Sequence, residues 1–262
     1  MNLDLQDKRA LVCGSTQGIG RAVAKQLAVM GADITLLARD EKMLLQVVQE
    51  LYNDGSQKHD FICADFNNPD EVKEKVEKYI HEKNQVHILV NNTGGPKSGP
   101  VTSAQANEFT EAFNIHLLCN HILAQACMEG MKSAHYGRII NIISTSVKQP
   151  IKGLGVSNTV RAAVANWSKT LAGEVGQFGI TVNNILPGAT NTTRLTQLIE
   201  DKSRKAGKSF NDIAREMMNE IPAGRFGEAE EIANAVAFLA SPASGYISGI
   251  NLPVDGGRTG CL

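Results

Sequence analysis

The chain has 262 residues, of which 42% are hydrophobic and 20% are charged, and its 26 basic and 27 acidic side chains leave a net charge of −1. This composition is that of an ordinary folded protein, and the length fits one α/β domain. The near-neutral balance argues against a nucleic-acid or anionic-membrane partner, since either would need a basic surface. No apolar run approaches the roughly 20 residues of a membrane span, and the first residues lack the apolar core of a signal peptide.

The cysteines point to a reducing compartment. There are five of them, an odd number, and no two form a C-x-x-C pair. This pattern is typical of a reduced, cytoplasmic protein and supplies neither a disulfide framework nor a zinc site. We therefore expect a cytoplasmic protein without a metal, whose thiols behave as small buried hydrophobic groups.

Short apolar runs alternate along the chain with segments of helical periodicity. The alternation predicts right-handed βαβ units and a doubly wound parallel sheet, which is a Rossmann fold. No linker, repeat or low-complexity tract divides the chain, so we predict a single domain over residues 1–262. The predicted strands cover 10–13, 34–38, 61–64, 88–91, 138–143, 181–186 and 249–254, and helical patterns cover 22–30, 43–51, 71–83 and the stretch from Val160 to Val175.

The segment 192–226 interrupts this alternation, because it is polar and charged and contains only a short helical pattern. In such a fold, a long excursion after a late strand usually covers the ligand crevice at the carboxyl ends of the strands. The segment is therefore a candidate substrate lid. The alternative is a solvated helical hairpin with no role toward substrate.

The first predicted strand runs into a G-x-x-x-G-x-G turn and then into a helix. Glycine permits the tight turn, the approach of the backbone to a diphosphate and the close packing of helix on strand. The helix N-terminus adds N–H donors and a partial positive charge. We therefore predict a dinucleotide-binding loop made of Gly14, Ser15, Thr16, Gln17, Gly18, Ile19 and Gly20.

The end of the second predicted strand indicates which dinucleotide is bound. An acidic residue there usually holds a free ribose 2′-hydroxyl, and an arginine usually accommodates a 2′-phosphate. Ala38 stands where the acid would be expected, and Arg39 follows it. Since a planar guanidinium suits a phosphate dianion, we favour NADP(H) over NAD(H). The alternative is that Asp40 binds the ribose while Arg39 faces solvent.

From the glycine loop to the C-terminus, the chain resembles the short-chain dehydrogenase/reductase family, and within it the beta-ketoacyl-ACP reductases. The resemblance implies that the adenine and the nicotinamide contact Asp65, Asn92, Gly94 and a Pro-Gly…Thr loop, and that Asn114 and Ser144 belong to the active site. Seven motifs in family order carry it: Asp65; Asn91-Asn92-Thr93-Gly94; Asn114; Ser144; Pro187-Gly188 with Thr190 and Thr192; 224–227; and 254–257.

The resemblance ends at the Tyr-x-x-x-Lys motif of the family. Ser157 stands where the tyrosine belongs and Arg161 where the lysine belongs, and none of the four tyrosines falls in this segment. Residues four apart share one helical face, which lets the family's lysine lower the pKa of the phenol and bind the nicotinamide ribose. A serine hydroxyl is too weak an acid to replace the phenol near neutral pH, and an arginine effectively never deprotonates. Arg161 is thus predicted to anchor the ribose, and Lys148 or Lys152 is a candidate proton donor, unless both are simply exposed loop lysines.

The resemblance implies an NADP(H)-dependent oxidoreductase that passes hydride between the nicotinamide and a carbonyl or alcohol carbon of a small molecule. Its altered catalytic set would be Asn114, Ser144, Ser157 and Arg161. Two alternatives remain open: a pseudoenzyme that binds the nucleotide as a sensor or subunit, and a non-redox lyase or isomerase. Family members commonly pair the helices that carry the Asn and the Tyr-x-x-x-Lys motif, so we expect a homodimer or homotetramer.

Overall fold

The predicted Rossmann fold is confirmed by a computed structural model, which describes residues 1–83 and 85–261. Within these residues, seven parallel strands form one sheet in the order β3-β2-β1-β4-β5-β6-β7. The strands are β1 (Arg9–Cys13), β2 (Asp33–Ala38), β3 (Asp60–Cys63), β4 (Ile88–Asn91), β5 (Gly137–Ile142), β6 (Ile180–Pro187) and β7 (Asn251–Val254). The α-helices are α1 (Gly18–Val29), α2 (Glu41–Glu50), α3 (Pro69–Lys83), α4 (Ala106–Phe113), α5 (Cys119–Ser133), α6 (Gly155–Val175), α7 (Thr193–Ala206), α8 (Phe210–Asn219) and α9 (Ala229–Ala240).

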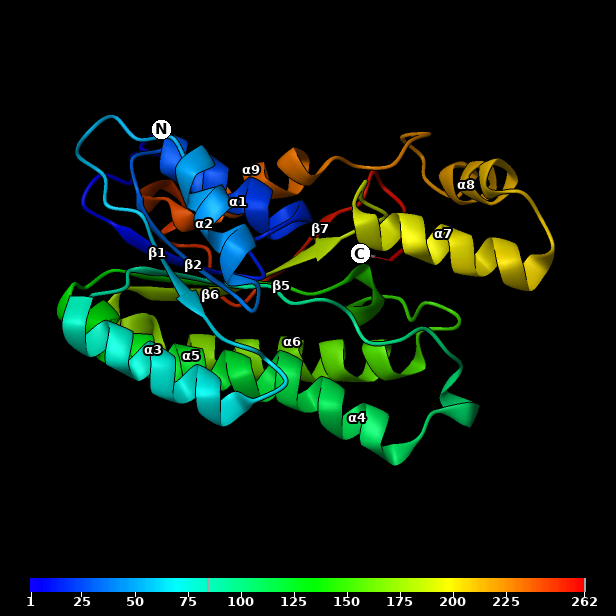
Figure 1. The fold of residues 1–262 in the computed structure, drawn as a ribbon, viewed down its shortest axis with the longest axis horizontal. Helices are drawn as coiled ribbons and strands as arrows, with labels where there is room; N and C mark the ends of the chain where they lie inside the picture. Colours follow the sequence, from blue (N-terminus) through cyan, green and yellow to red (C-terminus); the bar gives the residue numbers. More distant parts are fainter. Residues whose placement is uncertain (84, 262) are drawn as a thin grey trace.

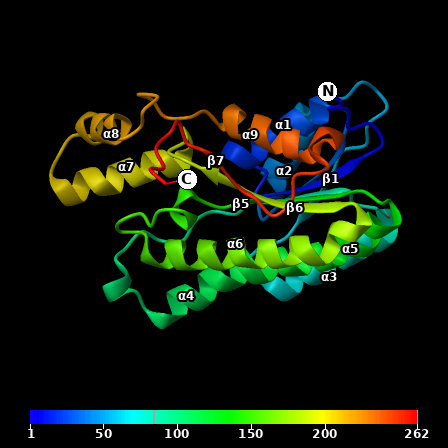
Figure 2. The same ribbon diagram turned by 180° about the vertical axis from the view of Figure 1, so that it is seen from behind.

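Helices cover both faces of the sheet, as Figures 1 and 2 show from opposite sides. Helices α1, α2 and α9 pack on one face, where Leu27 and Val236 join one buried apolar cluster. Helices α3, α5 and α6 pack on the other, where Leu123 and Val175 join a second cluster. Because both faces are covered, the strands read as continuous apolar runs. This explains why the strand bounds could be predicted to within two residues.

The strand order reverses between β1 and β4, since β1 pairs with β2 on one side and with β4 on the other. The chain therefore leaves the sheet in opposite directions from these two neighbours. In open parallel sheets, the crevice outside the carboxyl ends at such a point is where ligands bind. The candidate site therefore lies at this edge of the sheet.

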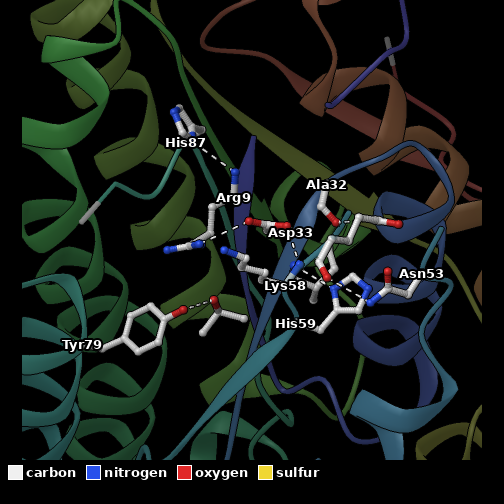
Figure 3. Close-up of polar contacts among 11 residues, drawn as sticks. Arg9, Ala32, Asp33, Asn53, Lys58, His59, Tyr79 and His87 are labelled. Carbon is white, nitrogen blue, oxygen red and sulfur yellow. Dashed lines mark hydrogen bonds and ion pairs between the residues drawn. The ribbon is translucent and has the colours of Figure 1, made fainter. Parts of the chain in front are cut away.

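Polar contacts close the amino edge of β1 and β2 (Figure 3). Arg9 forms an ion pair with Asp33 at 3.2 Å, and its backbone N–H donates to Nδ1 of His87 at 3.0 Å. The hydroxyl groups of Thr35 and Tyr79 lie 2.7 Å apart. These contacts join β1 and β2 to α3 and to the start of β4, and they stabilise the fold far from the predicted phosphate loop.

The segment 192–226 forms a helical pair, α7 and α8, that extends beyond the edge of the sheet (Figure 1). The pair has an apolar cluster of its own, made of Leu195, Ile199, Ile213 and Ala214. Its role as a substrate lid stays a prediction. None of the helices in the described ranges has the length and apolar character needed to cross a bilayer.

Two sequence-based expectations need correction. The spacing of Trp167 and Leu171 with Val160, Val164 and Val175 predicts one buried face of α6, but Trp167 and Leu171 are only partly buried and pack at the margin of the second cluster. Among the cysteines, Cys13, Cys119 and Cys127 are buried as expected, whereas Cys261 is exposed. Burial raises the pKa of Cys119 and of Cys127 to about 12, so these two thiols remain protonated.

Candidate active site

The glycine loop has the geometry that a bound diphosphate needs. Gly14 and Gly18 adopt positive φ angles of 58° and 52°, and a Cβ on Gly20 would lie 2.2 Å from the carbonyl oxygen of Gly14. Helix α1 begins at Gly18 with no side-chain cap and no acidic residue in its first turn, so its N–H groups stay available to an anion. Among the described residues, the buried Ser15 Oγ has no hydrogen-bond partner. This cradle fits the diphosphate of a dinucleotide.

The adenosine end of the crevice separates the roles of Arg39 and Asp40. Arg39 is exposed at the carboxyl end of β2. Asp40 instead caps α2, because its Oδ1 accepts the Met43 N–H at 3.0 Å. Asp65, at the end of β3, is half-buried and accepts the Asn67 N–H at 3.0 Å. Of these two neighbours, Asp40 is thus engaged in the helix cap, whereas Arg39 presents its charge at the surface.

The turn after β4 is tied to the glycine loop. The Nδ2 of Asn92 donates to the carbonyl oxygens of Cys13 at 3.3 Å and of Gly14 at 3.2 Å. Gly94 follows on the exposed surface, where a Cβ would meet no atom within 4 Å. The structure thus brings the two predicted cofactor segments together across the reversal of strand order.

Asn114 lies at a break in helical geometry. It opens a five-residue π-helical turn, Asn114–Leu118, between α4 and α5, and its carbonyl oxygen accepts the Cys119 N–H. Such turns occur frequently at functional sites, since the wider winding changes the direction of the side chains. Ser144 follows β5, and its Oγ accepts the Ser146 N–H at 3.1 Å. Both side chains are half-buried.

Ser157 and Arg161 lie one turn apart near the start of α6. Ser157 is half-buried, whereas Arg161 is 7% exposed and donates through Nη1 to the Ile142 carbonyl oxygen at 2.9 Å. Burial first, and the charge of Arg194 second, lower the pKa of Arg161 to about 10. The guanidinium is therefore still cationic at pH 7, and it holds a buried positive charge beside the end of β5.

The sequence analysis did not single out His116. It is 2% exposed, and its Nδ1 lies 2.7 Å from Thr93 Oγ1. Burial, together with the charge of Arg161, lowers the pKa of His116 well below its usual value, so the imidazole is neutral at pH 7. The signal available in the sequence was a polar residue, Thr93, in the Asn91-Asn92-Thr93-Gly94 turn, together with a histidine two residues after Asn114.

The loop after β6 lies next to the glycine loop. Thr190 Oγ1 donates to the Gly188 carbonyl oxygen at 3.1 Å, and Thr192 caps α7 by accepting the Leu195 N–H. The methyl group of Thr192 lies 3.2 Å from the position that a Cβ on Gly18 would take. The start of α7 therefore borders the diphosphate cradle.

The two lysines proposed as proton donors differ in their surroundings. Lys148 is half-buried and follows the short 3-10 turn that begins directly after Ser144. Lys152 is exposed farther along the same segment. Lys148 is thus the lysine nearer in the chain to the predicted catalytic serine.

The chain is similar to known oxidoreductases over almost its entire length. It matches the family model described as Enoyl-(Acyl carrier protein) reductase over residues 14–259. It is 34% identical over 253 residues to a 3-oxoacyl-[acyl-carrier-protein] reductase of Haemophilus influenzae, a match that covers 97% of this chain and 98% of that protein.

Solved structures agree with this result. The L-sorbose reductase of Gluconobacter frateurii, in complex with NADPH and L-sorbose, superposes with a TM-score of 0.93 at 29% identity over the full length of both chains. YwfH, an NADPH-dependent reductase involved in bacilysin biosynthesis, gives a TM-score of 0.92 at 26% identity and covers 97% of this chain and 99% of its own. With a matching family model, a relative above 30% identity and the same sheet, the chain belongs to the short-chain dehydrogenase/reductase family of oxidoreductases.

Proposed function

We propose that this oxidoreductase is NADP(H)-dependent and reduces a small carbonyl compound, or oxidises the corresponding alcohol, with an altered catalytic set. The observation that supports it best is the hydrogen bond that joins Asn92 to the glycine loop, with the cationic Arg161 buried at the end of β5. The NADPH bound in the similar L-sorbose reductase supports the same cofactor class. The preference for NADP(H) rests on Arg39, because Asp40 is engaged as a helix cap.

The nicotinamide, when bound, supplies or accepts the hydride, and the chain's own residues do the rest. Arg161 would bind the ribose hydroxyls and keep a positive field near the reacting oxygen. It cannot act as the acid, since its guanidinium stays protonated at neutral pH. Asn114 and Ser144 would orient the substrate and a water molecule through hydrogen bonds. Ser157 is a site hydroxyl rather than a proton donor, and Lys148 is the first candidate for that role.

Three further properties belong to this proposal. The chain acts in the cytoplasm, as its unpaired cysteines suggest. It works as a homodimer or homotetramer. The segment 192–226 covers the substrate, which the position of Thr192 against Gly18 supports.

Titration with NADPH, followed by an NADPH-consumption assay over a panel of aldehydes and ketones, tests the function. We expect NADPH binding and measurable turnover of at least one carbonyl compound. Tight binding without turnover of any compound would instead assign a nucleotide-binding pseudoenzyme. Product formation without a change at the nicotinamide absorbance band would assign a lyase or isomerase, and failure to bind either cofactor would refute the proposal.

A further inference from the structure

The segments that border the substrate side of the crevice are basic and contain no acidic residue. They follow β4, β5 and β6 and cover residues 92–107, 143–161 and 188–199. Acidic residues lie at their margins, since Glu108 and Glu200 follow directly in the chain and Asn191 Nδ2 donates to Glu228 Oε1 at 2.6 Å. Within these bounds the charge is positive, whereas the whole chain carries slightly more acidic than basic side chains. The basic residues in these segments are Lys97, Lys148, Lys152, Arg161 and Arg194.

These three segments are hydrogen-bonded to one another. The Gly99 N–H donates to the Gly153 carbonyl oxygen at 2.8 Å, and the Gly155 N–H donates to the Gly99 carbonyl oxygen at 3.0 Å. From the third segment, Arg194 donates through Nη2 to the Pro96 carbonyl oxygen at 2.8 Å. The three segments therefore lie together at the carboxyl ends of their strands, and the charges of their basic residues add there.

Arg194 joins the third of these segments to the first at the opening of the crevice, and among the described residues it has no acidic partner. It lies on the first turn of α7 and reaches the loop after β4, where its Nη2 is 3.8 Å from the position of a Cβ on Gly95. Its charge is felt by the buried Arg161. In the described part of the chain, neither guanidinium lies within 4 Å of a carboxylate. Two like charges around one crevice favour binding of an anion between them.

We propose that the substrate is a small anionic carbonyl compound, whose carboxylate or phosphate is bound by Arg194 at the mouth of the crevice. This inference rests on the proposed function and names its substrate class. With Nη2 held by Pro96, the remaining N–H donors of the planar guanidinium can bind an oxyanion in a directed way. Arg161 adds long-range attraction from the base of the crevice while its Nη1 stays on Ile142.

The diphosphate of the cofactor is a second oxyanion that an arginine at this position can bind. Thr192 borders the glycine loop, and Arg194 lies only two residues farther along the chain. An experiment must therefore measure cofactor binding and substrate binding separately.

The test compares the wild type with Arg194→Gln, Arg194→Lys and the control Arg204→Gln. Arg204 lies on the same helix, is exposed, and forms an ion pair with Asp201 at 3.5 Å. NADPH is titrated first by its fluorescence. The NADPH complex is then titrated with pyruvate, acetoacetate and levulinate, and with the methyl ester of each, so that the separation of carbonyl and carboxylate varies.

We expect at least one acid to bind the wild type and Arg204→Gln about tenfold or more tightly than its ester, as a charge-assisted contact provides. The ratio of the ester's dissociation constant to the acid's should fall to near one in Arg194→Gln and to an intermediate value in Arg194→Lys. The dissociation constant of NADPH should stay within a factor of about two of the wild-type value. Arg194 is exposed, so all variants should keep the wild-type unfolding midpoint.

Three results would overturn the inference. In the first, no acid binds more tightly than its ester in the wild type. In the second, the ratio survives in Arg194→Gln. In the third, Arg194→Gln loses NADPH affinity about tenfold with an unchanged ratio, which would assign the arginine to the diphosphate. A wild type that binds no NADPH is a different outcome, seen in the first titration, and it would refute the proposed function itself.

Discussion

Arg39 and Asp40 are neighbours with separate tasks at the carboxyl end of β2. Asp40 caps α2, and Arg39 is exposed beside the predicted adenosine site. We predict that Arg39→Ala weakens NADPH binding about tenfold or more and leaves NADH binding unchanged, because only NADPH carries the 2′-phosphate. Fluorescence titration of both cofactors measures this.

The control is Asp40→Asn, which keeps a residue able to cap α2 and removes the charge. It should bind NADH as the wild type does. An equal loss of both cofactors in Arg39→Ala, or a selective loss of NADH in Asp40→Asn, would favour the alternative in which Asp40 binds the ribose.

Ser157 and Arg161 hold the positions of the family's proton-transfer pair on α6. If they face the reacting carbon, Ser157→Tyr with Arg161→Lys restores a phenol and the amine that lowers its pKa. We predict roughly a 100-fold gain or more in reduction of generic ketones, which is the worth of a placed general acid. Ser157→Tyr alone should gain less at neutral pH. Initial rates of NADPH oxidation measure both.

Two outcomes would contradict this view of the pair. A wild type that already reduces simple ketones rapidly would have a proton donor in place, and Lys148→Gln followed by Lys152→Gln would locate it. A double variant that folds and binds NADPH but stays inert would mean that the substrate side of the crevice has also changed.

At the scale of elements, α7 and α8 depend on a small apolar cluster of their own. Ile213 of α8 is 5% exposed and packs in this cluster with Leu195 and Ile199. We predict that Ile213→Ala loosens the helical pair by about 2 kcal/mol or more. Trypsin cleavage after the basic residues between 202 and 208 should then accelerate about tenfold, whereas the global unfolding midpoint changes little.

Asn211→Ala, at an exposed position of the same helix, is the matched control. Saturating NADPH should slow cleavage in the wild type if the pair covers the ligands. A fall in the global midpoint without faster cleavage would show that the pair unfolds together with the sheet.

At the scale of the whole molecule, the buried imidazole of His116 and the half-buried imidazole of His87 link stability to pH. Burial first, and then the charges of Lys8 and Arg9, lower the pKa of His87 to about 4, and the pKa of His116 is lowered in the same direction. The unfolded chain takes up these protons near pH 6.5 and the folded chain does so only at lower pH. The contribution of these groups to the free energy of unfolding is therefore fully present above pH 6.5, and it is lost as the pH falls toward 4.

We expect His87 alone to account for a loss on the order of 2 kcal/mol between pH 6.5 and 4, measured by urea unfolding at each pH. His87→Asn keeps an acceptor near the Arg9 N–H but cannot titrate, so its stability should fall less over this range. If the free energy of unfolding of the variant depends on pH in the same way as that of the wild type, His87 does not cause the loss.

The assembly is the other property of the whole molecule. Phe113 and Leu118 are 44% and 37% exposed near the π-helical turn, whereas Leu123 of α5 and Val164 of α6 are buried in the monomer core. We predict a homodimer or homotetramer with closed symmetry. Light scattering at micromolar concentration measures the mass, and a stable particle of single-chain mass would refute the prediction.

The sequence by itself determined the sheet and the phosphate loop, because their signals are local. A strand covered on both faces is a continuous apolar run, and Gly14 and Gly18 follow from a turn that needs positive φ. The sequence also placed Ser157 and Arg161 on one helix, since the spacing of four residues follows from helical geometry alone.

Only the tertiary structure decided which distant residues share the crevice. His116 meets Thr93 across 23 residues, and Arg194 meets the Pro96 carbonyl across 98. It also decided that Arg161 is buried and donates to the carbonyl oxygen of Ile142, 19 residues away. No local pattern encodes such contacts, because parallel strands are joined through long crossovers and their carboxyl ends meet only when the sheet has formed.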